Sequence, residues 1–176
     1  MKLSRKGILL AVLQLAIVGS LAAKYAIDRA RFPRVWAQTV AYDPDLPIRG
    51  RYLSVRLRVD ADRVYGASQP PKSIQGNFWG DMRDVYLYAE NGHLVASSAP
   101  QPTGLSVTRW RARNGDMVAA LSEPVAYFLP EHAVDPSRRQ QGEELWVEVT
   151  VPKKGPPRPI RLAVKRGDKF TPLEIK

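Results

Sequence analysis

One short segment of the chain carries residue types that bind metal ions. Glu131, His132 and Asp135 lie within five positions of one another. Carboxylate and imidazole groups bind hard and borderline cations, so these three side chains are candidate ligands. The chain has only two His residues and no Cys, and the other His is far away in the sequence. Three ligands on one polar segment are weak support, and we expect no bound metal ion and no cofactor.

A serine nucleophile is the second chemistry to consider. Ser54 could serve a membrane-tethered Ser–Lys hydrolase of the signal-peptidase kind, but the sequence places no lysine to deprotonate its hydroxyl. The phosphate-binding loop, the dinucleotide fingerprint, the serine-hydrolase elbow and the zinc-protease motif are all absent from the sequence. The sequence therefore favours a binding protein over an enzyme. A tethered hydrolase, signal-peptidase-like or metal-dependent, is the alternative.

Basic residues around one expected strand are the candidate binding site. The candidates are Arg49, Gly50, Arg51, Tyr52, Arg56 and Arg58. Guanidinium groups hold carboxylates and phosphates through paired hydrogen bonds, so the four arginines beside the tyrosine can receive an acidic ligand or partner. The other interpretation is structural, because charged side chains are common on the solvated face of a strand.

The elements that would position these residues are strands. Leu53, Val55 and Leu57 alternate with polar residues, which is the period of a half-buried strand. Similar patterns predict strands at 35–41, 52–59, 84–90, 93–98, 105–113, 116–121, 125–129, 145–151, 160–165 and 169–175. We therefore expect a mainly β domain, an antiparallel β-sandwich or partly open barrel of about eight to ten strands.

Turn signals support this expectation. Asn91-Gly92 and Asn114-Gly115 each separate two expected strands, and Asn-Gly favours the type I′ hairpin turn. Residues 60–83 show no periodicity, and such a long irregular segment is often functional. Tyr86 and Tyr88 share one face of a strand. That face either packs under a second layer or forms a glycan or peptide groove.

The amino-terminal segment predicts a membrane anchor. Residues 7–23 contain no charged side chain, and the flanking residues extend the apolar helix to residue 27. The run exceeds the usual 7–15 residues of a signal-peptide core, which favours an uncleaved anchor. A cleaved signal peptide remains the alternative, with Ser20 and Ala22 at the −3 and −1 positions of the cut.

These patterns divide the chain into four parts. We expect a basic cytoplasmic tail at 1–6, a transmembrane anchor at 7–27, a basic linker at 28–34 and a β domain at 35–176. Of the chain's net charge of +10, a large share lies beside the apolar run, which is typical of membrane flanks and not of a nucleic-acid footprint.

The basic tail also predicts the orientation. Basic residues before and after the apolar run are nearly equal in number, so their count alone leaves the orientation open. A short basic tail before an apolar run is nevertheless the layout of a signal-anchor that exports everything after it. We therefore expect a single-pass protein of the bacterial inner membrane with its domain on the periplasmic, extracytoplasmic side. The lipid bilayer is the expected partner of residues 7–27, and nucleic acid is not an expected partner.

Two short stretches resemble the motifs of a known family. The matching residues are Asp43, Pro44, Arg49, Gly50 and Tyr52 in one stretch, and Tyr127, Phe128, Pro130, Glu131 and Glu144 in the other. The chain thus resembles the GDYXXLXY family of membrane-anchored bacterial domains. Arg51 stands where that family has Asp, Val55 where it has Leu, and Leu57 where it has the final Tyr.

The resemblance implies a role without an established activity. Members of this family often accompany multi-pass membrane proteins. The resemblance therefore implies an accessory or binding module of an envelope or membrane-protein complex, with a membrane protein as partner. The change to Arg51 puts in doubt any task that the family's carboxylate performs.

Overall fold

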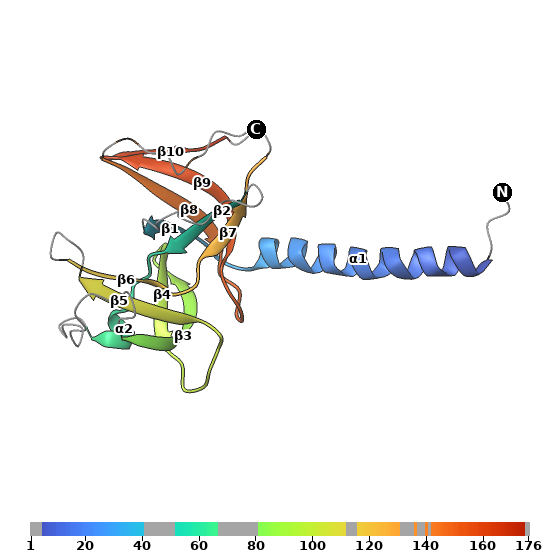
Figure 1. Cartoon of the computed structure of the whole chain (residues 1–176), viewed down its shortest axis with the longest axis horizontal. Helices are drawn as coiled ribbons and strands as arrows, with labels where there is room; N and C mark the ends of the chain where they lie inside the picture. Colours follow the sequence, from blue (N-terminus) through green and yellow to red (C-terminus); the bar gives the residue numbers. More distant parts are fainter. Residues whose placement is uncertain are drawn as a thin grey trace. The chain divides into compact units, whose positions relative to one another are not determined.

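A computed structural model describes residues 5–40, 52–66, 81–111, 116–130, 136, 140 and 142–174 of the 176-residue chain. The chain divides into two compact units, Met1–Phe32 and Pro33–Lys176. The first contains one helix and the second contains the strands, as Figure 1 shows.

Helix α1 spans Arg5–Arg31 and has no buried residue. At about 1.5 Å per residue its 27 residues extend over roughly 40 Å. Its length and composition are sufficient to cross a membrane. Residues 28–31, which the sequence assigned to the linker, are also helical. The helix ends before Pro33, whose ring cannot continue it.

The described strands form two antiparallel sheets, as the sequence predicted. The six-stranded sheet has the order β10-β9-β8-β1-β2-β7, and the four-stranded sheet has the order β4-β3-β5-β6. The strands are β1 (Arg34–Val40), β2 (Tyr52–Leu57), β3 (Met82–Glu90), β4 (His93–Ser98), β5 (Ser106–Arg111), β6 (Met117–Leu121), β7 (Val125–Phe128), β8 (Glu143–Thr150), β9 (Arg158–Arg166) and β10 (Lys169–Pro172).

The first predicted hairpin turn is confirmed. β3 and β4 pair antiparallel up to Glu90 and His93, and Asn91 and Gly92 between them have φ values of 50° and 79°. Both positive values are what a type I′ turn requires. β5 and β6 also pair antiparallel, from Arg111 opposite Met117 onward, while Asn114-Gly115 lies outside the described residues.

The chain after β2 connects the two sheets. The backbone N–H of Arg58 donates to Gln38 of β1, and that of Val59 donates to Ala119 of β6. Asp60 then exchanges backbone hydrogen bonds with Leu94 and Ala96 of β4. Because β4 and β6 are the two edges of the four-stranded sheet, residues 58–60 close that sheet. The domain therefore has features of both predicted architectures, the sandwich and the partly open barrel, because the residues that follow β2 of one sheet close the other sheet.

The core lies between and within the sheets. Its fully buried large side chains are Leu57, Val85, Val107, Leu145, Val147, Val149 and Leu162. They come from both sheets and from alternate positions of their strands, so one face of each strand is apolar. The segment 60–83, which the sequence left without regular structure, contains the short helix α2 (Asp62–Tyr65), whose Val64 and Tyr65 join this core.

Candidate functional site

Pairing of β2 with β7 brings the two family-like stretches together. Tyr52 lies opposite Phe128, and Leu53 lies opposite Tyr127. Pro130 follows β7 and is exposed. Glu144 lies on β8, two strands away from β2, where its carboxylate accepts a hydrogen bond of 3.0 Å from the Trp146 indole. Asp43, Pro44, Arg49, Gly50, Arg51 and Glu131 lie outside the described residues.

We call Tyr52 and Phe128 the motif surface. The Phe128 side chain is 80% exposed and Tyr52 is 42% exposed. Their ring centroids lie 6.5 Å apart at an interplanar angle of 59°. β7 is an edge strand of the six-stranded sheet. Two exposed aromatic rings on a sheet edge are typical of a contact surface.

The four arginines of the candidate binding site, which we call the arginine strip, are described only at Arg56 and Arg58. Arg56 and Arg58 do follow Tyr52 at alternate positions of the strand and its continuation. Arg56 is half-buried, whereas Arg58 is exposed and donates a hydrogen bond of 3.0 Å to the side-chain carbonyl of Gln38. Arg58 therefore belongs to a different place, a cavity where the two sheets meet.

We call this place the junction cavity; it has a volume of about 400 Å³. Three of its buried lining residues are small: Ala37 of β1, Ala61 before α2, and Ala119 of β6. All three also belong to the hydrophobic core, so the cavity borders the core. Trp36 and Trp146 also line it.

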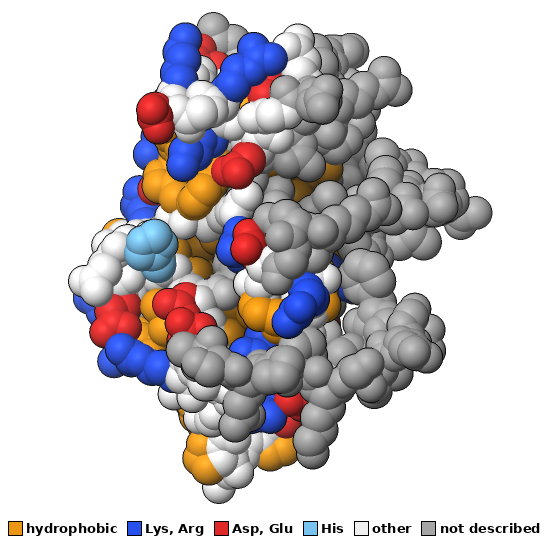
Figure 2. All heavy atoms as spheres, turned by 90° about the vertical axis from the view of Figure 1, so that its left-hand side faces the viewer, with side chains coloured by type: hydrophobic (Ala, Val, Ile, Leu, Met, Phe, Trp, Pro, Cys, Tyr) orange, Lys and Arg blue, Asp and Glu red, His pale blue; other side chains and the backbone are white. Residues whose placement is uncertain are grey.

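Charged side chains of both signs surround the cavity. Arg58, Asp60 and Asp62 line it and are exposed. His93, at the start of β4, also lines it and is exposed. The Asp60 carboxylate accepts a hydrogen bond of 3.1 Å from the backbone N–H of Asp62, which fixes the entry to α2. A similar mixture of basic and acidic side chains, with hydrophobic atoms between them, covers the described part of the face in Figure 2.

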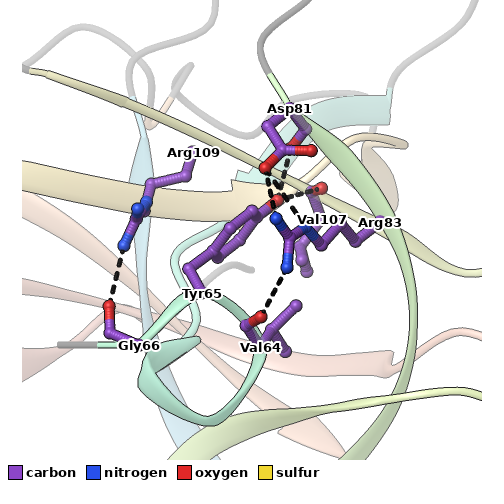
Figure 3. Close-up of polar contacts among 7 residues, drawn as sticks. All are labelled: Val64, Tyr65, Gly66, Asp81, Arg83, Val107 and Arg109. Atoms are coloured by element: carbon purple, nitrogen blue, oxygen red, sulfur yellow. Dashed lines mark hydrogen bonds and ion pairs between the residues drawn. The ribbon is translucent and has the colours of Figure 1, made fainter. Parts of the chain in front are cut away.

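The remaining charged lining residue is Arg109, which is only 7% exposed. Its guanidinium donates a hydrogen bond of 3.1 Å to the carbonyl of Gly66 and stacks 4.5 Å from the ring centroid of Tyr65. Arg83 lies 4.8 Å from the same centroid. Tyr65 is therefore held beside two guanidinium groups, as Figure 3 shows.

The Tyr65 hydroxyl anchors α2 to the four-stranded sheet. Its single hydrogen is shared between the carbonyl oxygens of Asp81, 2.5 Å away, and Val107, 2.9 Å away. Arg83 forms a two-pronged contact with the Asp81 carboxylate and donates to the Val64 carbonyl at 2.9 Å. Burial, reinforced by the Asp81 carboxylate, raises the pKa of Tyr65 to about 12, against the opposing effect of the two arginines. The phenol thus stays neutral and keeps donating.

The tryptophans of the cavity are held from outside by the last hairpin. Phe170 of β10 makes edge-on contacts with Trp36, at a centroid separation of 4.8 Å, and with Trp146, at 6.1 Å. The Arg161 guanidinium lies 5.4 Å from the Trp36 ring and binds Glu148 at 2.6 Å. These contacts fix the two indoles in place.

The other candidate residues do not form a catalytic arrangement in the described part of the chain. Ser54 lies opposite Ala126 of β7. Among the described residues, no group of three His, Cys, Asp or Glu side chains is placed to hold a metal ion. His132 and its two acidic neighbours lie outside those residues. Of the aromatic pair on β3, Tyr86 is exposed, and Tyr88 is covered by Arg63 of α2, which donates a hydrogen bond to its hydroxyl.

Sequence reasoning missed the junction cavity and the Tyr65 stack. The only local signal was the alternation in β1, which sets Trp36 and Gln38 on the face opposite Val35 and Ala37. Trp36 and Trp146 line the same cavity because β1 pairs with β8, which places Gln38 opposite Trp146. Local periodicity carries no information about that pairing.

No protein-family model matches the chain, and no curated protein or solved structure is significantly similar to it. The resemblance to the GDYXXLXY family stays a prediction.

Proposed function

We propose that this protein is a membrane-anchored binding module that serves as an accessory of a membrane-protein complex. In this proposal α1 crosses the bacterial inner membrane once, and the β domain works on the periplasmic side. The partner is a membrane protein, and the motif surface is where its extracytoplasmic part docks.

The exposure of Phe128 is the observation that carries the proposal. Full burial of a phenylalanine side chain is worth roughly 1.5–3 kcal/mol, so an 80% exposed ring leaves most of that free energy unused in the isolated chain. Tyr52 lies directly across the strand pair and enlarges the patch. Tyrosine and phenylalanine are enriched at protein interfaces, and an edge strand offers backbone groups to a partner as well.

The membrane placement is supported by α1 and its flanks. The helix is long and apolar enough to span the bilayer. Basic residues flank the apolar run on both sides, as is typical of a spanning helix: Lys2, Arg5 and Lys6 before it, and Lys24, Arg29, Arg31 and Arg34 after it. A partner that is itself a membrane protein would share the plane of the bilayer, which raises the local concentration of the two surfaces.

Site-specific photocrosslinking tests the proposal in intact cells. We expect a photoreactive phenylalanine analogue at position 128 to give one discrete adduct with a membrane protein, and the same analogue at position 86 to give none. Tyr86 is the control because it is also an exposed aromatic residue, at 43%, but lies on the other sheet.

A pair of substitutions provides the quantitative arm. The partner identified by crosslinking is then co-purified with each variant from detergent extracts. Phe128→Ser should lower the amount of partner recovered at least tenfold, whereas Tyr86→Ser should leave that amount unchanged. Equal adducts at positions 128 and 86, or equal recovery with Phe128→Ser, would contradict the proposal. The unfolding midpoint of each variant establishes that the domain is intact.

A further inference from the structure

The geometry points to a second binding site: the junction cavity binds an uncharged saccharide, with one sugar ring against the two indoles and its hydroxyls on the charged rim. This inference is independent of the proposed function. The cavity is lined by residues of both sheets and of the segment that joins them, and neither Tyr52 nor Phe128 lines it.

The size and the depth of the cavity suit a small ligand. Ligand pockets in proteins commonly have volumes of roughly 300–1,000 Å³, and this one has about 400 Å³. Apart from Arg109, its buried lining is apolar, with Val59 and Leu94 beside the three alanines. A bound ring would therefore have an apolar surface beneath it.

The balance of charge argues against strongly ionic ligands. Two arginines, Arg58 and Arg109, and two aspartates, Asp60 and Asp62, line the same cavity. A phosphate or other multivalent anion would meet both carboxylates, and a polycation would meet both guanidiniums. Single ion pairs with the exposed rim residues are weak, because exposed pairs contribute only about 0–1 kcal/mol. The recognition chemistry is therefore stacking and neutral hydrogen bonding.

Saccharide hydroxyls match the polar groups of the lining. Each hydroxyl both donates and accepts a hydrogen bond. The rim offers carboxylate acceptors from Asp60 and Asp62, and N–H donors from Arg58. Gln38 offers both kinds of group from one side chain. The apolar face of the sugar ring then packs on Trp36 and Trp146, which supply flat apolar surfaces with little side-chain freedom to lose.

The site is also held in shape before any ligand arrives. Arg109 is fixed by the Tyr65 ring and the Gly66 carbonyl, and Trp36 is fixed by Phe170 and Arg161. Groups that are already ordered lose little conformational entropy on binding. Such preorganisation is what a site for a small, weakly binding ligand needs.

The test uses the full chain in phosphatidylcholine nanodiscs, because sugar-based detergents would compete for the site. The probes are cellobiose, maltotriose and N,N′-diacetylchitobiose, with trialanine and inorganic phosphate as the charged alternatives. Binding is measured by saturation-transfer NMR and by tryptophan fluorescence. We expect at least one saccharide to bind, and neither trialanine nor phosphate to displace it.

Two variants connect that binding to the cavity. Ala119→Leu fills the cavity and Trp146→Leu removes one indole, and each should weaken saccharide binding at least tenfold. Trp110→Leu is the matched control, because Trp110 is a half-buried tryptophan of β5 that does not line the cavity. It should bind like the unaltered chain, as should Phe128→Ser.

The outcomes separate this inference from the proposed function. No signal with any of the three saccharides would overturn it, as would displacement of the saccharide by trialanine or phosphate, or equal losses with Trp146→Leu and Trp110→Leu. Loss of partner recovery with Phe128→Ser and unchanged saccharide binding would support both. If Ala119→Leu lowers the unfolding midpoint, the comparison of Trp146→Leu with Trp110→Leu decides whether the saccharide binds in the cavity.

Discussion

Helix α1 and the β domain place the same aliphatic residue types in opposite environments. In α1, Leu10 is 57% exposed and Leu15 is 72% exposed, and no residue of the helix is buried. In the domain, Leu57, Leu145 and Leu162 are at most 1% exposed. The domain therefore supplies an apolar environment for its own leucines, whereas α1 does not.

The difference teaches what each region needs from its surroundings. A soluble helix normally buries one apolar stripe against a core. The apolar run of α1 has no such partner within its own unit and is continuous around the helix, which is the pattern of a segment surrounded by lipid.

Leu10→Arg with Leu15→Arg should have the largest effect. An arginine near the centre of a spanning helix costs about 2.5–3.5 kcal/mol of insertion free energy, which applies to position 15. Position 10 lies nearer the end of the apolar run, so a second arginine there adds a smaller cost. We expect the doubly substituted chain to leave the membrane fraction on carbonate extraction. Leu10→Ala with Leu15→Ala is the control and should stay there. Retention of the arginine variant would mean that α1 does not depend on a lipid environment.

Leu57→Ala should produce the largest loss of stability of the domain. The side chain is fully buried, and such truncations cost about 2–5 kcal/mol of unfolding free energy. Leu15→Ala should leave that free energy unchanged. Denaturant titration followed by tryptophan fluorescence measures both, and equal effects of the two substitutions would break the contrast between the regions.

Tyr65→Phe should destabilise the domain by about 1–3 kcal/mol, because the carbonyls of Asp81 and Val107 lose the one donor that they share. The effect should also depend on pH. The folded state raises the pKa of Tyr65 from 10 to about 12, so its contribution is fully present below pH 10. The contribution is lost as pH rises toward 12, by roughly 2–3 kcal/mol in total.

The pH dependence gives this prediction its control. Unfolding free energies of the two proteins should differ by a constant amount below pH 10 and converge between pH 10 and 12. A constant difference up to pH 12 would show that the neutral phenol does not anchor α2. Lysine and arginine titrations affect both proteins alike and cancel in the comparison.

Gly92→Ala should have the smallest effect on the unfolding free energy of the domain. Gly92 has a φ of +79°, which costs an L-residue about 1 kcal/mol, and an added Cβ would contact no atom within 4 Å. Gly19→Ala in α1 meets equally open space without a positive φ and should not destabilise its helix. Thermal unfolding of the domain measures the first change and helix content of the full chain measures the second.

Local patterns predicted the elements well and the candidate sites poorly. Alternation of Leu53, Val55 and Leu57 identified β2, and Asn91-Gly92 identified the first hairpin, because both signals lie within a few residues. α2 has only four residues, too few for a helical period to appear.

The sites depend on pairings between distant segments. The junction cavity requires residues 58–60 to cross from β1 to β4 and β6, and the motif surface requires β2 to pair with β7. Such register is decided by the whole core and not by any single strand. The arginine strip illustrates the consequence, because Arg58 lines the cavity and Arg56 does not.

Cysteine labelling in open membrane fragments tests most directly whether α1 is embedded in lipid. The chain has no native Cys, so a single introduced cysteine reports without background. Leu15→Cys should stay unreactive toward a water-soluble maleimide until detergent dissolves the bilayer, whereas Lys169→Cys, exposed on β10, should react at once. Equal labelling of both cysteines in undissolved membranes would contradict the account.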